Sequence, residues 1–435
     1  MNDTLVDAES QRIIDSVDES LVLDLAKKVI EIPSPTGEEE NFARFLVGTM
    51  REAGFQSRMQ EIYPGRFNAV GLLKGDTRAA TVLLSGHMDT SVRGDEDWLE
   101  GVGFKNHAVL RDGLLLGNGI FNMKNAFACY FGAIDAIRRA GIKIPGQVLM
   151  AGLAGEVEQA PIDEFKGPAY DGYGVGMRYL LTHGYTADYH ILGEPTGMTP
   201  LLGNWGTTWA KVTTLGEFAH TAWADLHLNA IEEMWTLWRA LDDWIREHRK
   251  ANGYMGVAPQ VNRAAIRGGL PWKAARTPAS CSMYIDIRVP PNKRLIDVQQ
   301  GFEAEVQRIA REKLQKPVSL QWYVSRPGTV IDASELVAQS ICKAHRRVIG
   351  SDVEPSFAQP WCSDATDSNR YGIPTIIYGQ GRHAKPDAGV HGHGHGPKDS
   401  RIKEGESVHV EDLYKATSIY ALAMMELLRA VPASR

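Results

Sequence analysis

Residues 81–90 read TVLLSGHMDT. The stretch begins with a short apolar run that has the length and composition of a buried strand, and it ends in His87 and Asp89. A histidine followed two residues later by an aspartate suits a metal site, because the carboxylate can orient the imidazole ring and raise its basicity. Taken alone the pair is a weak signal, so its meaning depends on the rest of the chain.

Three further apolar runs end in the same way. Glu156 and Glu158 follow the run in QVLMAGLAGEVE (147–158), Glu194 follows the run in DYHILGEPT (188–196), and Gly379 follows the run in PTIIYGQG (374–381). A helical apolar pattern from Phe127 to Ile137 separates the first two runs along the chain. Alternating strands and helices predict an α/β fold with a mostly parallel sheet and helices on both faces. Ligands bind at the carboxyl ends of such strands, where all of these polar residues fall.

The middle of the chain has a different pattern. Between residues 204 and 325 the order of apolar patterns is strand, helix, strand, strand, helix, strand. This order predicts a smaller, ferredoxin-like α+β domain inserted into the sheet domain. The expected organisation is therefore a discontinuous catalytic domain, 1–203 and 326–435, with a lid or dimerisation domain at 204–325. A chain of 435 residues also favours more than one domain.

Composition narrows the class of protein. The net charge is −6 and no basic tract is present, which argues against a nucleic-acid partner. No apolar run approaches the roughly 18 residues of a membrane helix, and the polar, acidic start does not resemble a secretory signal. The cysteines lack CxxC spacing, which fits reduced thiols and a cytoplasmic location; they are Cys129, Cys281, Cys342 and Cys362.

Seven motifs occur in the order used by one family of metallopeptidases. They are SGHMDT, GNGIFNMKNAF, AGLAGEVE, HILGEPTG, GEFAHTAWADLHLNAI, YIDIRVPP and CSDATDSNRYGIPTIIYGQG. In these motifs nearly the whole chain resembles the family of aminoacylase, acetylornithine deacetylase, succinyl-diaminopimelate desuccinylase and carboxypeptidase G.

The resemblance implies roles for individual residues. His87 and Glu194 would bind a metal, Asp89 would support His87, and Glu156 would act as the general base. Two further roles fall in the inserted domain: His220 would stabilise the developing oxyanion, often from the partner subunit, and Arg288 would grip a substrate carboxylate. The inserted domain would also join subunits into a homodimer or higher homo-oligomer.

The chain departs from the family where a second metal is normally bound. Asn122 stands in place of a bridging aspartate, Val157 in place of a second glutamate, and the segment 399–413 lacks a histidine at the expected position. Two dications about 3.5–4 Å apart repel by roughly 15–20 kcal/mol even at a dielectric constant of 20. A neutral amide cannot offset that repulsion. We therefore expect one exchangeable divalent transition metal (Zn, Mn, Co or Fe) per chain, bound by His87, Glu194 and Asn122.

Two alternatives remain open for the second metal. Glu158 can replace the missing glutamate, and a histidine at position 383, 391, 393 or 395 can replace the missing histidine. The histidine-glycine run at 391–399 also reads as an ordinary loop or as a lid segment.

The substrate is expected to be a small molecule that bears a carboxylate. Ala275 stands where relatives commonly carry an asparagine that holds a peptide-like substrate, and Trp205 and Trp209 can either stack on an aromatic ring or pack at the domain hinge. The favoured hypothesis is a hydrolase that cleaves a C–N bond with metal-activated water. An aromatic amine of the 5-nitroanthranilate type, releasing ammonia, is the leading candidate. The alternatives are an N-acyl amino acid deacylase or dipeptidase, and a non-catalytic metal-binding scaffold.

Overall fold

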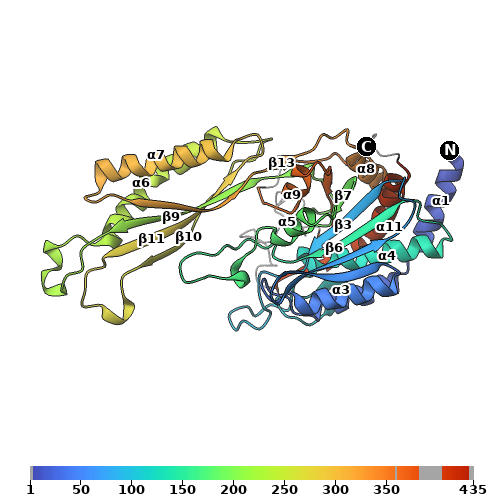
Figure 1. Cartoon of the computed structure of the whole chain (residues 1–435), viewed down its shortest axis with the longest axis horizontal. Coiled ribbons are helices and arrows are strands. Elements are labelled where there is room, and N and C mark those ends of the chain that lie inside the picture. Colours follow the sequence, from blue (N-terminus) through green and yellow to red (C-terminus); the bar gives the residue numbers. More distant parts are fainter. Residues whose placement is uncertain (1–2, 358–359, 382–403, 431–435) are drawn as a thin grey trace. The chain divides into compact units, whose positions relative to one another are not determined.

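The computed structural model describes residues 3–357, 360–381 and 404–430. The chain divides into two compact units (Figure 1). The first comprises Met1–Gly203, Val330–Phe357 and Ser363–Arg435, and the second comprises Asn204–Thr329 and Ala358–Cys362. The expected boundaries were 203/204 and 325/326, and the observed second crossing lies at 329/330. No helix in the described part of the chain is long and apolar enough to cross a membrane.

A six-stranded sheet forms the centre of the first unit, in the order β1-β2-β6-β3-β7-β14. Strands β6, β3, β7 and β14 run parallel to one another, as the four apolar runs predicted. Strands β1 and β2 add an antiparallel hairpin at one edge, which was not predicted. The strand bounds are β1 Gln56–Tyr63, β2 Arg66–Leu73, β3 Thr81–His87, β6 Gln147–Leu153, β7 Tyr189–Leu192 and β14 Thr375–Ile377.

Helices cover both faces of this sheet, which confirms the predicted layers. On one face Gly86 of β3 lies directly under Phe127 of α4, and a Cβ there would approach the Met123 side chain to 2.6 Å. On the other face Leu83 and Leu149 pack with Leu180 of α5. The helices of this unit are α1 Asp3–Asp15, α2 Glu19–Ile30, α3 Glu40–Glu52, α4 Asn125–Arg139, α5 Val175–Thr182, α8 Leu336–Ile349, α9 Ala365–Arg370 and α11 Val410–Arg429.

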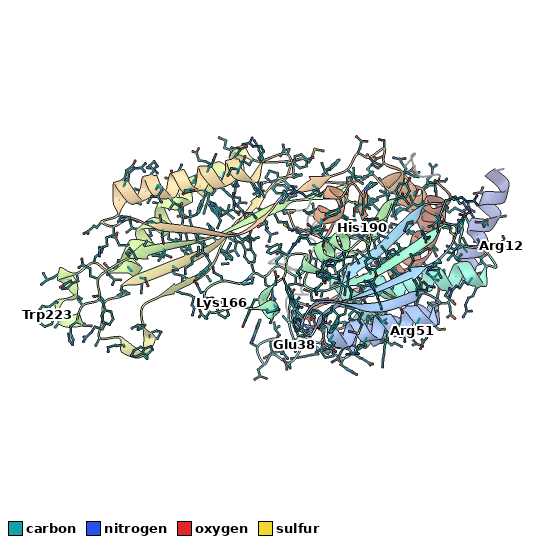
Figure 2. All side chains as sticks on the ribbon, viewed as in Figure 1. Arg12, Glu38, Arg51, Lys166, His190 and Trp223 are labelled. Atoms are coloured by element: carbon teal, nitrogen blue, oxygen red, sulfur yellow. The ribbon has the colours of Figure 1, made fainter. Side chains whose placement is uncertain are left out.

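Short strands complete the first unit. Strands β15, β5 and β4 form a small antiparallel sheet beside α11, while β8 and β13 lie where the chain passes between the units. Their bounds are β4 Val109–Arg111, β5 Leu114–Leu116, β8 Gly203–Asn204, β13 Thr329–Val330 and β15 Ser407–His409. His190, on β7, is buried within the large sheet (Figure 2).

The second unit has the predicted order of elements. Its antiparallel sheet has the strand order β10-β11-β9-β12, and helices α6 and α7 pack together over one face of it (Figure 1). The sequence β9-α6-β10-β11-α7-β12 is the ferredoxin-like arrangement. The bounds are β9 Gly206–Leu215, α6 Ala230–Ala251, β10 Val261–Gly268, β11 Ser280–Val289, α7 Leu295–Lys313 and β12 Ser319–Arg326.

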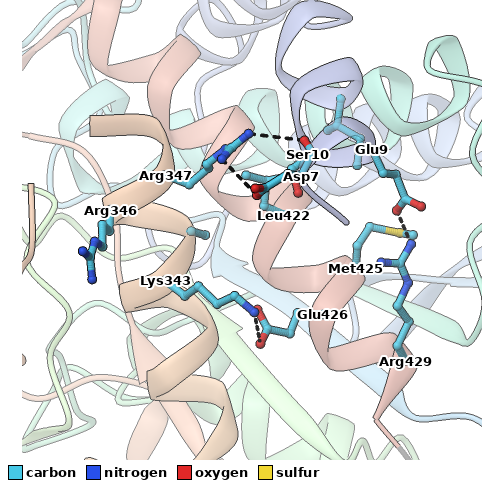
Figure 3. Close-up of a pocket in the computed structure, with 12 residues that line it drawn as sticks. Asp7, Glu9, Ser10, Lys343, Arg346, Arg347, Leu422, Met425, Glu426 and Arg429 are labelled. Carbon is cyan, nitrogen blue, oxygen red and sulfur yellow. Dashed lines mark hydrogen bonds and ion pairs between the residues drawn. The ribbon is translucent and has the colours of Figure 1, made fainter. Parts of the chain in front are cut away.

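Helix α1 is attached to the first unit mainly by side chains at a shallow cavity of about 610 Å³ (Figure 3). Arg347 of α8 pairs with Asp7 at 3.0 Å, and Arg429 of α11 pairs with Glu9. The Arg347–Asp7 pair is exposed and the Arg429–Glu9 pair is half-buried. Ion pairs that water can reach contribute little to stability, so the buried Ile13 side chain is the stronger contact.

Candidate metal centre

His87 is the last residue of β3, and its ring is fully buried. Its Nδ1 lies 2.8 Å from the main-chain carbonyl oxygen of Asp89, whereas the nearer Asp89 carboxylate oxygen is 3.6 Å away. A carbonyl oxygen can only accept a hydrogen bond, so Nδ1 carries the proton in the neutral ring. The lone pair of Nε2 is then available to a metal ion.

Three oxygen atoms surround Nε2 of His87. Asn122 Oδ1 lies at 3.0 Å, Glu194 Oε1 at 3.8 Å and Glu156 Oε2 at 4.0 Å. Ligand atoms that bind one ion at about 2.0–2.2 Å are at most about 4.4 Å apart, so each of these distances is compatible with a shared ion. His87, Glu156 and Glu194 also each offer a ligand atom within 4.8 Å of the other two. The donor set therefore fits a divalent transition metal.

The fold explains why these residues meet. Glu156 follows β6 and Glu194 follows β7, the two strands that flank β3, so all three side chains come from the carboxyl ends of neighbouring parallel strands. Asn122 comes from the irregular segment Ile120–Lys124 that precedes α4. The convergence that the apolar runs predicted is thus present in the structure.

Buried charge dominates the electrostatics of the site. The pKa of Glu194 is raised to about 8, mainly by burial; His87 lowers it, and the nearby carboxylates, including Glu156, add to the increase. Burial alone would lower the pKa of His87, but the carboxylates of Glu194 and Asp89 outweigh it and the net shift is upward. Asp364 contributes to both shifts. A bound cation would relieve this crowding of carboxylates.

Sequence reasoning did not single out three residues around the site. Asp364 is fully buried and lies in the quoted CSDATDSNRYG motif, which was the only signal for it. Thr36 donates to the Asp89 carboxylate at 2.9 Å. Glu406 accepts from the backbone amides of Phe121 and Asn122 at 2.9 and 3.1 Å, and burial raises its pKa to about 7.

The metal-ligand group among the described residues does not include the other predicted ligands. Glu158 is not a member of the metal-ligand group found among the described residues. The histidines at 383, 391, 393 and 395, and the run 391–399, lie outside the residues that the structure describes. That Glu158 or one of these histidines completes a second metal site therefore stays a prediction.

Three predicted residues belong to the second unit. His220 is exposed, and its Nδ1 accepts from the backbone amide of Ala222 at 3.1 Å. Arg288 pairs with Asp286 at 2.9 Å and is mostly buried. Trp205 is fully buried, so its indole has no exposed face for stacking in this structure. The roles of these residues towards a substrate stay predictions.

Comparisons with known proteins identify the family of the chain. Residues 83–426 match the model of peptidase family M20/M25/M40. N-formyl-4-amino-5-aminomethyl-2-methylpyrimidine deformylase of Bacillus subtilis (strain 168) is 27% identical over 397 residues, covering 83% of this chain and 87% of that protein. Acetylornithine deacetylase of Vibrio parahaemolyticus (serotype O3:K6, strain RIMD 2210633) is 23% identical, covering 77% and 82%.

Solved structures show the same fold. A tripeptidase from Staphylococcus aureus matches with a TM-score of 0.71 and 18% identity, covering 95% of this chain and 100% of that chain. Human carnosine dipeptidase 1 matches with a TM-score of 0.71 and 11% identity, covering 97% and 99%. The family match spans most of the chain. The protein belongs to peptidase family M20/M25/M40 and is a metal-dependent hydrolase that acts on C–N bonds.

Proposed function

We propose that this protein removes an acyl group from a small N-acylated amine, using one divalent transition metal per chain. The observation that carries the proposal is the buried cluster of His87, Glu156 and Glu194, with the Asn122 amide oxygen 3.0 Å from the His87 ring. The names of the two curated relatives support the reaction class, because one is a deformylase and the other a deacetylase.

His87, Glu194 and Asn122 are the residues to which we assign the ion. When bound, a divalent transition metal acts as a Lewis acid and makes a coordinated water more acidic. Glu194 is the only anionic member of this set, because an amide oxygen carries no formal charge. The low negative charge of the set supports a single ion rather than a pair.

Glu156 is assigned the role of general base. Its carboxylate is almost completely buried and lies 4.0 Å from Nε2 of His87, close to where the ion would sit. From there it can take a proton from the attacking water and return it to the departing amine nitrogen. We assign His220 to the oxyanion and Arg288 to a substrate carboxylate, following the family resemblance.

The first substrate candidate is an N-formylated aminomethylpyrimidine, the compound in the name of the Bacillus subtilis relative. The second is an aryl amine of the 5-nitroanthranilate type, the candidate that the sequence favoured. The neutral Asn122 is compatible with both candidates, because a single bound ion can activate the attacking water in either reaction. Trp209, packed edge-on against Tyr323 with ring centroids 5.7 Å apart, provides an aromatic surface in the second unit that would suit a planar substrate.

A product assay tests these candidates against one another. The purified chain, loaded with Mn²⁺ or Zn²⁺, would be given the N-formyl pyrimidine, N-acetylornithine, N-succinyl-diaminopimelate, a dipeptide and 5-nitroanthranilate. We expect formate or another carboxylate to appear together with a free amine. Ammonia from 5-nitroanthranilate alone would move the assignment to the second candidate. A chain that binds metal but hydrolyses none of these compounds would contradict the proposal.

We further propose that the protein forms a homodimer through its second unit. Strand β10 is an edge strand, and Ile266 on it is 50% exposed. Ile231 and Trp235, one turn apart on α6, are also exposed, and Gly268 at the end of β10 lies against Ile231. An unpaired strand edge beside exposed apolar side chains is a favourable surface for pairing with a second copy.

We also propose a cytoplasmic location. All four cysteines are thiols outside any disulfide in the structure, as is usual in a reducing compartment. Fractionation of the native host cells, followed by immunodetection, would test this.

A further inference from the structure

The carboxylate of Asp89 makes its short hydrogen bonds to the turn that carries Glu156. Its Oδ1 accepts from the backbone amide of Glu156 at 3.0 Å, and its Oδ2 accepts from the next amide, Val157, at 2.9 Å. The ring of His87 is contacted more closely by the Asp89 carbonyl, at 2.8 Å, than by the carboxylate, at 3.6 Å. The main-chain carbonyl of Asp89 therefore orients the imidazole. The Asp89 carboxylate instead binds the backbone of the turn at Glu156 and Val157.

The turn that this carboxylate binds has no regular secondary structure of its own. Strand β6 ends at Leu153, and Glu156 lies in the irregular segment that follows. One carboxylate that accepts from two consecutive amides fixes both peptide planes, and such charge-assisted hydrogen bonds are strong in a buried setting. Asp89 is fully buried, so water does not compete for these contacts.

Thr36 completes the set of donors. Its hydroxyl donates to Asp89 Oδ2 at 2.9 Å. The segment around Thr36 is itself fastened beside the end of β3: the Ser34 hydroxyl donates to the Met88 carbonyl at 2.6 Å, and the Thr90 amide donates to the Ser34 carbonyl at 2.9 Å. Thr36 therefore has a fixed position from which to orient the carboxylate.

A second contact from the same N-terminal segment holds the chain beyond Glu156. Glu39 and Arg66 form a buried ion pair, with Arg66 Nε donating to Glu39 Oε2 at 3.1 Å. The Arg66 guanidinium also donates to the Asp171 carbonyl at 2.6 Å. Gly155 lies so close to this guanidinium that a Cβ there would be 2.5 Å from Arg66 Nη2. Arg66 thus packs against the residue before Glu156 and hydrogen-bonds to the chain that follows it, at Asp171.

We propose that Thr36 and the Asp89 carboxylate are positioning residues for Glu156, holding the general base through its backbone rather than through the metal ligand His87. The inference rests on the proposed function in one respect, the assignment of Glu156 as the base. A base must lie within hydrogen-bonding reach of the proton that it removes, and small displacements lower the rate strongly.

Thr36→Val and Thr36→Ser form the matched pair that tests this. Valine has nearly the same shape but no hydroxyl, whereas serine keeps the donor. Hydrogen–deuterium exchange measured by mass spectrometry on a peptide covering residues 153–160 should become at least about tenfold faster in Thr36→Val and stay near wild type in Thr36→Ser. The dissociation constant for Mn²⁺, measured by calorimetry, should change by less than about threefold in both.

Turnover separates this inference from the proposed function. The substrate is whichever compound of the product assay the wild-type chain hydrolyses. With it, Thr36→Val should lower kcat by about tenfold or more with little change in KM, and Thr36→Ser should have a kcat near that of wild type. Unchanged exchange, or a loss of Mn²⁺ affinity as large as the change in exchange, would overturn the inference. So would faster exchange with an unaltered kcat, although the amide-hydrolase assignment would then still stand.

Asp89→Asn provides a second variant. A carboxamide nitrogen cannot accept from an amide N–H, so at least one of the two backbone hydrogen bonds must be lost. If the carboxylate mainly holds the Glu156 turn, exchange in 153–160 should rise while Mn²⁺ binding remains. If Mn²⁺ binding fails and exchange does not change, the carboxylate acts on His87 and the inference is wrong.

Discussion

The two units differ in which side chains they bury and which they expose to solvent. The first unit buries ionisable side chains, with His87, Asp89 and Glu194 all almost inaccessible to water. The second exposes large apolar side chains, including Trp235 and Trp223, which is labelled in Figure 2. Buried charge is costly unless a partner compensates it, and exposed apolar surface is costly unless another surface covers it. This comparison supports our proposals that the first unit holds the catalytic site and that the second unit pairs with another copy of the chain.

The largest effect is expected for Glu156→Gln. Glutamine keeps the shape of the side chain but cannot accept a proton, so kcat should fall by about 10²–10⁴-fold. Calorimetry should show Mn²⁺ still bound, because His87, Glu194 and Asn122 are unchanged. Glu158→Gln, two residues on and outside the metal-ligand group, is the matched control and should retain near-normal activity. A Glu156→Gln variant with a near-normal rate would remove Glu156 from the role of base.

The next largest effect is expected on dimerisation, from a charged residue placed in the exposed apolar surface of the second unit. Trp235→Glu is expected to raise the dimer dissociation constant by at least about 30-fold, because truncating a central aromatic residue typically costs 2 kcal/mol or more. Sedimentation velocity would measure the shift towards monomer. Trp98→Glu is the control, since Trp98 is 75% exposed on the first unit and should leave assembly unchanged. If both variants behave alike, the second unit is not the dimer surface.

The buried His190 should make the first unit sensitive to acid. Burial lowers its pKa to about 3 from 6.5, so the folded state cannot take up a proton that the unfolded state binds below pH 6.5. This histidine therefore contributes stability at neutral pH that is lost as the pH falls, about 2 kcal/mol by pH 5. Between pH 7.5 and pH 5, the free energy of unfolding measured in urea should fall less for His190→Asn than for wild type. Equal losses would mean that His190 is not responsible.

The smallest of these effects is expected for Asn122→Asp, which changes the affinity of the site for the metal ion. The added negative charge should tighten Mn²⁺ binding by about tenfold, and Asn122→Ala should weaken it. Competition with a chelator would measure both constants. The stoichiometry should remain one ion per chain, because Val157 still supplies no ligand. Two tightly bound ions in wild-type protein would contradict the single-metal assignment.

The residues at strand ends were predictable because parallel packing brings those ends together. His87, Glu156 and Glu194 each follow an apolar run, so their convergence required only that the runs be neighbours in one sheet. The order of elements in the second unit was predictable for a similar reason, since each strand and helix carries its own periodic pattern. The antiparallel β1–β2 hairpin was missed because hairpin pairing depends on partners and not on the pattern of one strand alone.

Contacts between segments distant in the sequence were beyond prediction. Thr36 and Asp89 are 53 residues apart, and Glu406 lies 284 residues after the Asn122 amide that it binds. Asp364 was part of a recognised motif, but nothing in its local pattern indicated that its charge acts on His87 and Glu194. Trp205 was a stacking candidate by residue type alone, and only the packing around it decided that its ring is fully buried.

The sequence by itself determined the kinds of metal ligand available, the uncharged side chain at position 122 and the alternation of strands and helices that forms the sheet. These features depend on residue identity and local periodicity. Only the tertiary structure decided which hydrogen bonds the Asp89 carboxylate makes and which backbone holds Glu156. A short polar side chain has several possible partners of equal chemistry, and the fold alone selects which of them come within about 3 Å.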